Sequence, residues 1–142
     1  ISPLRDQWTI LGNSILLVGR DDHSLPRFTG KQRANLKDIL KDAPETARQL
    51  PMILLDHQPH VLAEAENAGA ALQLSGHTHH GQFWPINHIV KRMYESAYGH
   101  SIRGLTHYFV SQGTGYWGPP IRNTGRPEVL LFRIKFIKTG AE

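Results

Sequence analysis

Three short apolar runs alternate with helical segments in the first half of the chain, and each run ends in polar residues. The runs are Ile15–Val18, Met52–Leu55 and Ala71–Leu74. The segments between them, residues 31–42 and Val61–Ala68, have apolar residues at helical spacing. Strands that alternate with helices form parallel sheets with right-handed crossovers. The order therefore predicts an α/β domain built from parallel βαβ units.

Further strands are predicted on both sides of these units. Trp8–Leu11 and Ser14–Gly19 flank Gly12-Asn13, a pair that is typical of a β-hairpin. Tyr108–Ser111 is a short strand candidate. Val129–Lys138 alternates apolar with mostly basic residues, which predicts a closing strand with one wet face.

Two regions of the second half lack a clear period. Residues 82–104 are predicted to form a long irregular segment, and a segment of that length in a compact domain is usually functional or contains unrecognised secondary structure. Residues 112–120 form a glycine-rich turn, in which Tyr116 and Trp117 either line a substrate mouth or belong to a surface turn. No internal repeat and no linker between domains is recognised, so a single domain over residues 1–142 is expected.

Composition narrows the chemistry that these 142 residues can perform. Cysteine is absent, so disulfides and thiolate metal sites are excluded, whereas histidine occurs nine times. The net charge of +4 is compatible with an anionic substrate but is too small to indicate nucleic acid as a specific partner. No run of 18 apolar residues and no signal peptide is recognised. The first residue is Ile rather than Met, so we expect either a cut piece of a longer protein or a processed or engineered start.

Polar residues follow each of the three predicted parallel strands. Asp21-Asp22-His23, Asp56-His57 and residues 77–80 come directly after the apolar runs. Because parallel strands point the same way, we expect these side chains to gather at the carboxyl edge of the sheet, where open α/β sheets bind ligands. A histidine from each of the last two strand ends predicts a metal site.

The segment Gly76-His77-Thr78-His79 is the strongest local pattern. If it is extended, His77 and His79 point to the same side with Cα atoms roughly 6–7 Å apart. That separation suits two metal ions about 3.5–4 Å apart, with one imidazole on each. His80 would then point away and serve as an exposed or supporting residue.

Residues 55–59, Leu-Asp-His-Gln-Pro, and residues 75–79, Ser-Gly-His-Thr-His, resemble the last two metal-ligand motifs of the calcineurin-like metallophosphoesterases. Further segments resemble the same family, and the branch indicated is that of bacterial membrane-associated phosphohydrolases. These segments are Gly19-Arg20-Asp21-Asp22, Tyr98-Gly99, residues 110–115, Pro120-Ile121-Arg122 and Pro127-Glu128.

The resemblance implies a fold and a chemistry. The fold would be half of a β-sandwich flanked by helices. His57 and His77 would bind one divalent metal (Mn, Fe or Zn) and His79 the other, and a hydroxide held between them would attack phosphorus in line. Asp22 is not a shared ligand of the family and would orient a ligand or cap a turn. Members of this branch often have an N-terminal membrane anchor.

The resemblance covers only the C-terminal half of the family domain. The remaining ligands come from three earlier motifs, Asp-x-His, Gly-Asp-x-x-Asp and Gly-Asn-His, which are not recognised in this chain, and the histidine that assists the leaving group is among them. Without a bridging carboxylate, three imidazoles cannot offset the repulsion between two cations. We therefore expect these 142 residues alone to be inactive and to bind at most one metal ion weakly.

Two other expectations follow. The sheet face that the absent half would cover is expected to be covered by that half, by self-association or by a rearranged segment. The alternative function is a non-catalytic, histidine-rich metal-binding or interaction module, and a nucleic-acid binder ranks last because no aromatic–basic stripe is present.

Overall fold

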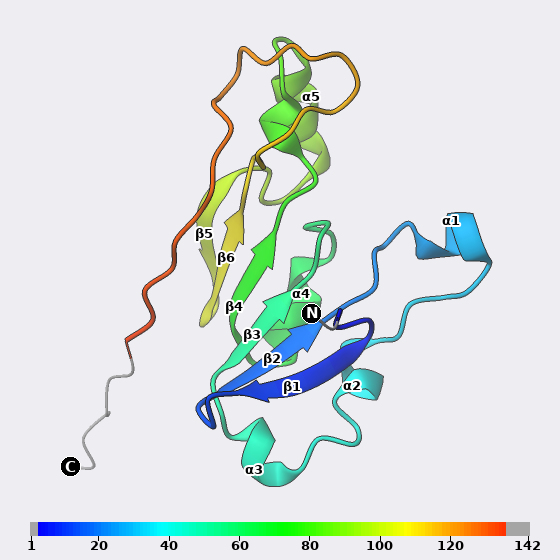
Figure 1. The fold of residues 1–142 in the computed structure, drawn as a ribbon, viewed down its shortest axis with the longest axis vertical. Coiled ribbons are helices and arrows are strands. Elements are labelled where there is room, and N and C mark those ends of the chain that lie inside the picture. The colour runs from blue at the N-terminus through cyan, green and yellow to red at the C-terminus, as the bar shows by residue number, and fades with distance from the viewer. Residues whose placement is uncertain (1–2, 136–142) are drawn as a thin grey trace.

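One six-stranded mixed sheet organises the chain in this computed structural model, which describes residues 3–135 (Figure 1). The order of the strands is β1-β2-β3-β4-β6-β5. Neighbours from β2 to β6 are parallel, and β1 and β5 pair antiparallel at the two edges. The strands are β1 (Gln7–Leu11), β2 (Ile15–Gly19), β3 (Met52–Leu55), β4 (Ala70–Ser75), β5 (Gly99–Arg103) and β6 (Thr106–Val110).

The predicted α/β class and parallel units are confirmed. The three apolar runs form β2, β3 and β4, and the helix between β3 and β4 is α4 (Leu62–Asn67). The predicted hairpin joins β1 to β2, with Gly12 at φ 57° and Asn13 at φ 54°. These are the positive angles that glycine and asparagine accept most readily.

The predicted helix over residues 31–42 is wrong in extent. Only α2 (Leu36–Ile39) forms there, and two further short helices, α1 (Leu25–Thr29) and α3 (Glu45–Arg48), flank it. Pro26 lies in the first turn of α1, where proline is well tolerated. Leu36 and Ile39 are buried, so packing rather than a long amphipathic period fixes this region.

The prediction that residues 82–104 are irregular is also wrong. They contain α5 (Ile86–Met93) and strand β5. The apolar residues of α5 do recur at helical spacing, but the helix is only eight residues long. β5 and β6 form a hairpin closed by the pair Arg103 and Thr106, with Gly104 at φ 57° in its two-residue turn.

The closing strand predicted over Val129–Lys138 is absent from residues 129–135, and residues 136–138 lie outside the described part. Figure 1 shows this segment running past β5 and β6 as an unpaired trace. Of its alternating apolar residues, Phe132 packs edge to face on Phe109, with ring centroids 5.3 Å apart. Alternation predicts a strand only where a neighbouring strand accepts its backbone hydrogen bonds, and here the segment lies over the sheet face instead.

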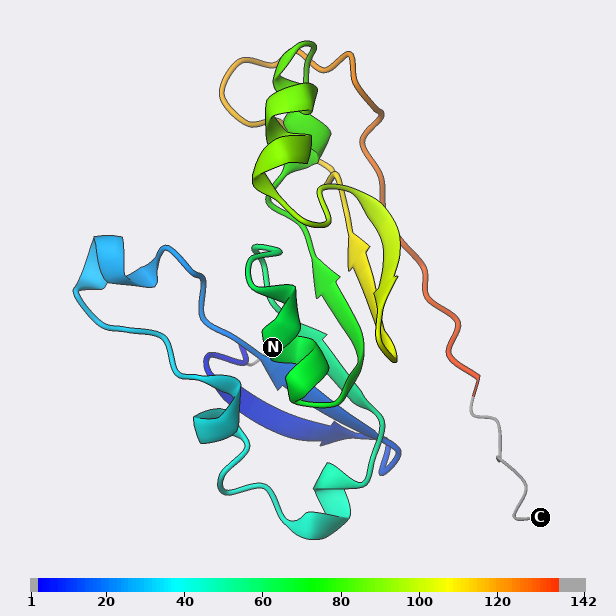
Figure 2. The same cartoon turned by 180° about the vertical axis from the view of Figure 1, so that it is seen from behind.

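The main core lies on one face of the sheet. Leu16, Val18 and Leu54 pack there against helices α2, α3 and α4, and α4 is seen in front of the strands in Figure 2. Within residues 3–135, no helix has the length and apolar character needed to span a membrane.

The opposite face of the sheet is only partly covered. Leu17, Leu55 and Phe109 line a hollow of about 680 Å³ on this face, together with Leu130 and Phe132 of the C-terminal segment. A sheet with one packed face and one open face is what half of a sandwich would present.

The hydroxyl of Tyr108 ties β6 to α4 within this core. It donates a 2.7 Å hydrogen bond to the carbonyl of Leu62, and the Tyr108 side chain is buried. Replacing Tyr108 with Phe leaves that carbonyl without this donor, so the free energy of unfolding is expected to fall by about 1–2 kcal/mol. Urea denaturation of the two proteins measures the difference, and equal midpoints would contradict the assigned bond.

Candidate metal centre

The histidine motif follows β4 as a tight turn, not as an extended segment. His77, His79 and His80 have φ values of 66°, 48° and 53°, and residues 79–81 form a 3₁₀ turn. Thr78 lies under the turn and donates a 2.6 Å hydrogen bond from Oγ1 to the carbonyl of Ala97. The expected extended geometry is therefore wrong. Left-handed residues other than glycine are uncommon and concentrate at functional sites, which makes this turn a candidate.

The ends of β3 and β4 bring His57 and His77 together. Their rings meet edge to face with centroids 5.3 Å apart. The amide of Gly76 donates to the carbonyl of His57 at 2.9 Å, so the two strand ends are joined directly. Adjacent parallel strands thus deliver two imidazoles to one point on the carboxyl edge, as the strand order predicts.

His79 turns toward a different neighbour. Its Nδ1 lies 3.2 Å from Nη2 of Arg122, 43 positions further along the chain. A guanidinium only donates hydrogen bonds, so Nδ1 is the unprotonated nitrogen of the ring in this contact. Among residues 3–135, no group of three or more His, Asp or Glu side chains is arranged to hold a metal ion.

The donor set fits a divalent cation in chemistry but is incomplete in geometry. Burial lowers the pKa of His77, and the neighbouring His57 lowers it further. Burial also lowers the pKa of His79, with added repulsion from Arg122. Both rings are therefore biased toward the neutral form that binds metals. The described residues alone supply imidazoles without the carboxylates that would complete a two-metal site.

Asp22 lies beside this edge but contacts none of the three histidines through a hydrogen bond. Its Oδ1 accepts hydrogen bonds from the amide and hydroxyl of Ser24 and, at 2.8 Å, from Nε2 of Gln58. Burial acts to raise the pKa of Asp22, but these hydrogen bonds and His57 lower it overall. Asp22 thus caps the turn after β2 and anchors the residue next to His57.

Asp21, Asp22 and His23 form an Asp-x-His triplet, so the letters of one of the three motifs expected to be missing do occur in this chain. In the structure its two members diverge. Asp21 pairs with Arg5 at 2.8 Å, whereas the His23 ring packs on His60 with centroids 4.7 Å apart. This triplet does not bring a carboxylate and an imidazole to one metal position.

The other three predicted residues, His80, Tyr116 and Trp117, have different surroundings. His80 stacks on Tyr98 with ring centroids 4.5 Å apart, away from the paired histidines. Trp117 lines a groove together with His77 and His79, whereas Tyr116 is exposed outside it.

Two residues near the histidines were not found from the sequence. Arg122 contacts His79, as described. Gln82 is buried, and its Nε2 donates to the carbonyls of Trp117 at 2.7 Å and Pro119 at 3.0 Å. Both act across more than 30 positions. The family resemblance included the segment Pro120-Ile121-Arg122 but gave Arg122 no role, and the only signal for Gln82 was its place close to the histidine motif.

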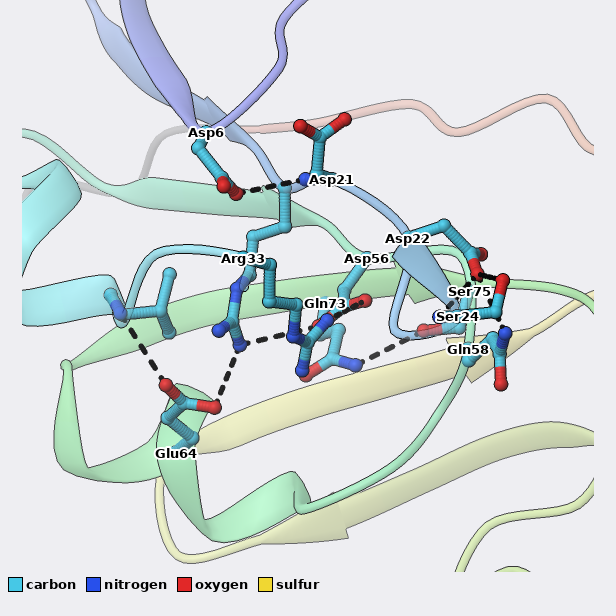
Figure 3. A network of polar contacts seen from close by, with 12 residues as sticks. Asp6, Asp21, Asp22, Ser24, Arg33, Asp56, Gln58, Glu64, Gln73 and Ser75 are labelled. Carbon is cyan, nitrogen blue, oxygen red and sulfur yellow. Dashed lines mark hydrogen bonds and ion pairs between the residues drawn. The ribbon is translucent and has the colours of Figure 1, made fainter. Parts of the chain in front are cut away.

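A network of buried ion pairs surrounds Asp56 at the carboxyl edge of the sheet, next to His57 (Figure 3). Asp56, which precedes His57, faces Arg33 at 3.0 Å and Arg20 at 3.4 Å. Arg20 also pairs with Glu64 at 2.7 Å. Burial raises the pKa of Asp56 against the attraction of the two arginines. The network fixes the end of β3, and with it the backbone position of His57.

The lowered histidine pKa values predict a loss of stability in acid. Burial lowers the pKa of His60, His77, His79 and His80 below the ordinary value of 6.5. Below pH 6.5 the unfolded chain binds more protons at these sites than the folded chain, so stability is full above that pH and falls as the pH drops. Urea denaturation at pH 7.5, 6.5 and 5.5 measures this trend, and unchanged stability down to pH 5.5 would contradict it.

Comparison with known proteins finds relatives whose names all contain the term metallophosphoesterase. The chain is 37% identical over 136 residues to an uncharacterized metallophosphoesterase of Helicobacter pylori strain J99, and 31% identical over 136 residues to one of Aquifex aeolicus. It is 39% identical over 126 residues to the zebrafish (Danio rerio) transmembrane protein with metallophosphoesterase domain.

The alignments cover most of this chain but a minor part of each relative. They include 89%, 93% and 85% of this chain, against 35%, 50% and 28% of the Helicobacter, Aquifex and zebrafish proteins. The chain thus spans half or less of the length of these relatives. No protein-family model and no solved structure matches it. Because animal proteins are among the relatives, the expected restriction to a bacterial branch is not supported.

Proposed function

Because this chain belongs to the metallophosphoesterase family, we propose that the whole protein hydrolyses phosphoric esters with two divalent metal ions. In this proposal His57 and His77 are ligands of one ion and His79 is a ligand of the other. The observation that supports it best is that His57 and His77 meet at the ends of two adjacent parallel strands. Their ring centroids are 5.3 Å apart.

The proposed roles follow from the chemistry of these residues. The imidazoles of His57, His77 and His79 suit Mn, Fe or Zn. Such ions supply a nucleophilic hydroxide at neutral pH and offset charge on the phosphoryl group. Arg122 lies beside His79, where its guanidinium can pair with a phosphoryl oxygen. Asp22 and Gln58 hold the His57 segment in place through their 2.8 Å hydrogen bond.

The carboxylate ligands are proposed to come from elsewhere in the whole protein. The relatives are at least twice the aligned length, which leaves room for the three earlier motifs. The open sheet face, with Leu17, Leu55 and Phe109, is proposed to pack on that part or on a second copy of this chain. These 142 residues alone are then expected to lack turnover.

The experiment compares two proteins, the full-length protein and the 142-residue chain, on a chromogenic phosphomonoester and a chromogenic phosphodiester. The full-length protein is expected to hydrolyse at least one of them, to lose activity in EDTA and to regain it with Mn²⁺ or Zn²⁺. The isolated chain is expected to show no turnover. Full metal-dependent turnover from the isolated chain would refute the proposal that another part of the protein supplies the carboxylate ligands. An inactive full-length protein would refute the proposed hydrolysis of phosphoric esters.

One observation favours the alternative of a non-catalytic metal-binding module. Within residues 3–135, no three ligand side chains are arranged for a metal ion. A full-length protein that binds Mn²⁺ or Zn²⁺ stoichiometrically but hydrolyses neither ester would support this alternative.

A further inference from the structure

Helix α5 presents an apolar side that the described part of the chain leaves uncovered. None of its residues is buried, and Ile89 and Met93 are 52% and 64% exposed. Ile86, Ile89, Val90 and Met93 recur at the spacing of one helical face, and together with Tyr94 and Trp117 they line a groove of about 290 Å³. A concentrated apolar surface of this kind usually marks a binding site.

The groove adjoins the histidines. His77 and His79 belong to its lining, whereas no Asp, Glu, Lys or Arg does. Lys91 and Arg92 are on the same helix but outside the groove. A ligand that reaches both ends would therefore have a polar end at the histidines and an uncharged, apolar remainder along α5.

Trp117, which lines the groove together with residues of α5, is fixed to the turn that bears the histidines. Gln82 follows His79 by three positions, is buried, and holds the carbonyls of Trp117 and Pro119 at 2.7 and 3.0 Å. This double hydrogen bond sets the position of Trp117 relative to the histidine turn. The groove is thus aligned with the site, as a substrate pocket requires.

We propose that this groove binds the apolar chain of a phosphoric ester, so that the preferred substrates carry an alkyl or acyl group next to the phosphate. The proposal rests on the proposed function, because the histidine end of the groove is where phosphorus would be held. Its occupant is the substrate's own chain, since the groove is continuous with the proposed metal ligands and has no Asp, Glu, Lys or Arg in its lining.

The test uses methyl-, butyl- and octylphosphonate, which are not hydrolysed, with the Mn²⁺-loaded full-length protein. Burial of a methylene strengthens binding by about two- to fourfold, so octylphosphonate, with seven more methylenes, is expected to bind at least about a hundredfold more tightly than methylphosphonate. Calorimetry below the aggregation concentration of the probe gives the three dissociation constants. The change in Trp117 fluorescence, read against a Trp117→Phe variant, provides a second signal.

Two variants separate the groove from general surface effects. Ile89→Gln places an amide in the groove and is expected to reduce the octyl-to-methyl ratio of affinities at least about fivefold. Leu105→Gln is the matched control, because Leu105 is 94% exposed in the turn between β5 and β6. It is expected to keep the ratio of the unaltered protein.

The outcomes distinguish this inference from the proposed function. Equal affinities for the three phosphonates in an active enzyme would overturn the proposal that the groove binds the apolar chain, and would leave the proposed function in place. The same result is expected if another segment of the protein fills the groove. Failure of every phosphonate to bind, together with absence of hydrolysis, would overturn both. A ratio that falls equally in both variants would also overturn the groove.

Discussion

Replacing Asp56 with Ala is expected to lower the free energy of unfolding by about 3–5 kcal/mol, the largest stability effect predicted for this chain. The Asp56 side chain is 2% exposed and faces the Arg20 side chain, which is 3% exposed. Removing the carboxylate leaves two arginines at the end of β3, with Glu64 as the nearest remaining partner of Arg20. Uncompensated charge in a buried position accounts for most of the expected loss.

Thermal and urea denaturation of the Asp56→Ala protein measure this effect. For a chain of this size the melting temperature is expected to drop by about 10–20 °C. Asp21→Ala is the matched control, because Asp21 pairs with the exposed Arg5 and such surface pairs contribute little. If both variants melt at the same temperature, the buried ion pairs of Asp56, which form one part of Figure 3, do not stabilise the fold.

Replacing His79 with Ala in the full-length protein is expected to reduce kcat/KM for a phosphoric ester about a thousandfold. The loss of one imidazole ligand removes several kcal/mol of transition-state stabilisation, and each 1.36 kcal/mol corresponds to a factor of ten. Metal content is expected to fall at the same time, which mass spectrometry of the dialysed protein measures.

The neighbouring residue gives a sharp control for this experiment. His80 is adjacent in sequence but stacks on Tyr98, so His80→Ala is expected to reduce kcat/KM less than about tenfold. Similar losses in the two variants would show that the turn as a whole, and not the imidazole of His79, is required. An active His79→Ala enzyme with unchanged metal content would remove His79 from the proposed ligand set.

The sequence predicted the central strands well because their signal is local. The residues of β2 and β3 are continuous apolar runs with polar residues directly after them, as buried parallel strands require. The same logic predicted that His57 and His77 lie at adjacent strand ends. It could not predict α5, whose eight residues fall in a region without a clear start signal.

The details of the site depended on contacts between distant positions. The positive φ angles of His77 and His79 oppose the usual preference of histidine, so the spacing of the motif alone suggested an extended segment. Arg122 contacts His79, and Gln82 donates a hydrogen bond to the carbonyl of Trp117. Both are tertiary contacts between distant positions, and no local sequence pattern predicts them. The alternation in residues 129–135 failed as a predictor because no strand in the described part of the chain pairs with that segment.

The strand order has a consequence for handling the protein in concentrated solution. β1 and β5 terminate the sheet, so each presents one row of backbone N–H and C=O groups that no other strand of residues 3–135 occupies. Such rows are templates for lateral addition of another chain, and β1 (Gln7–Leu11) contains no charged residue to discourage it. Repulsion between copies with a net charge of +4 opposes this association, and salt screens that repulsion. Purified samples are therefore expected to remain dispersed longer at low ionic strength than at high ionic strength.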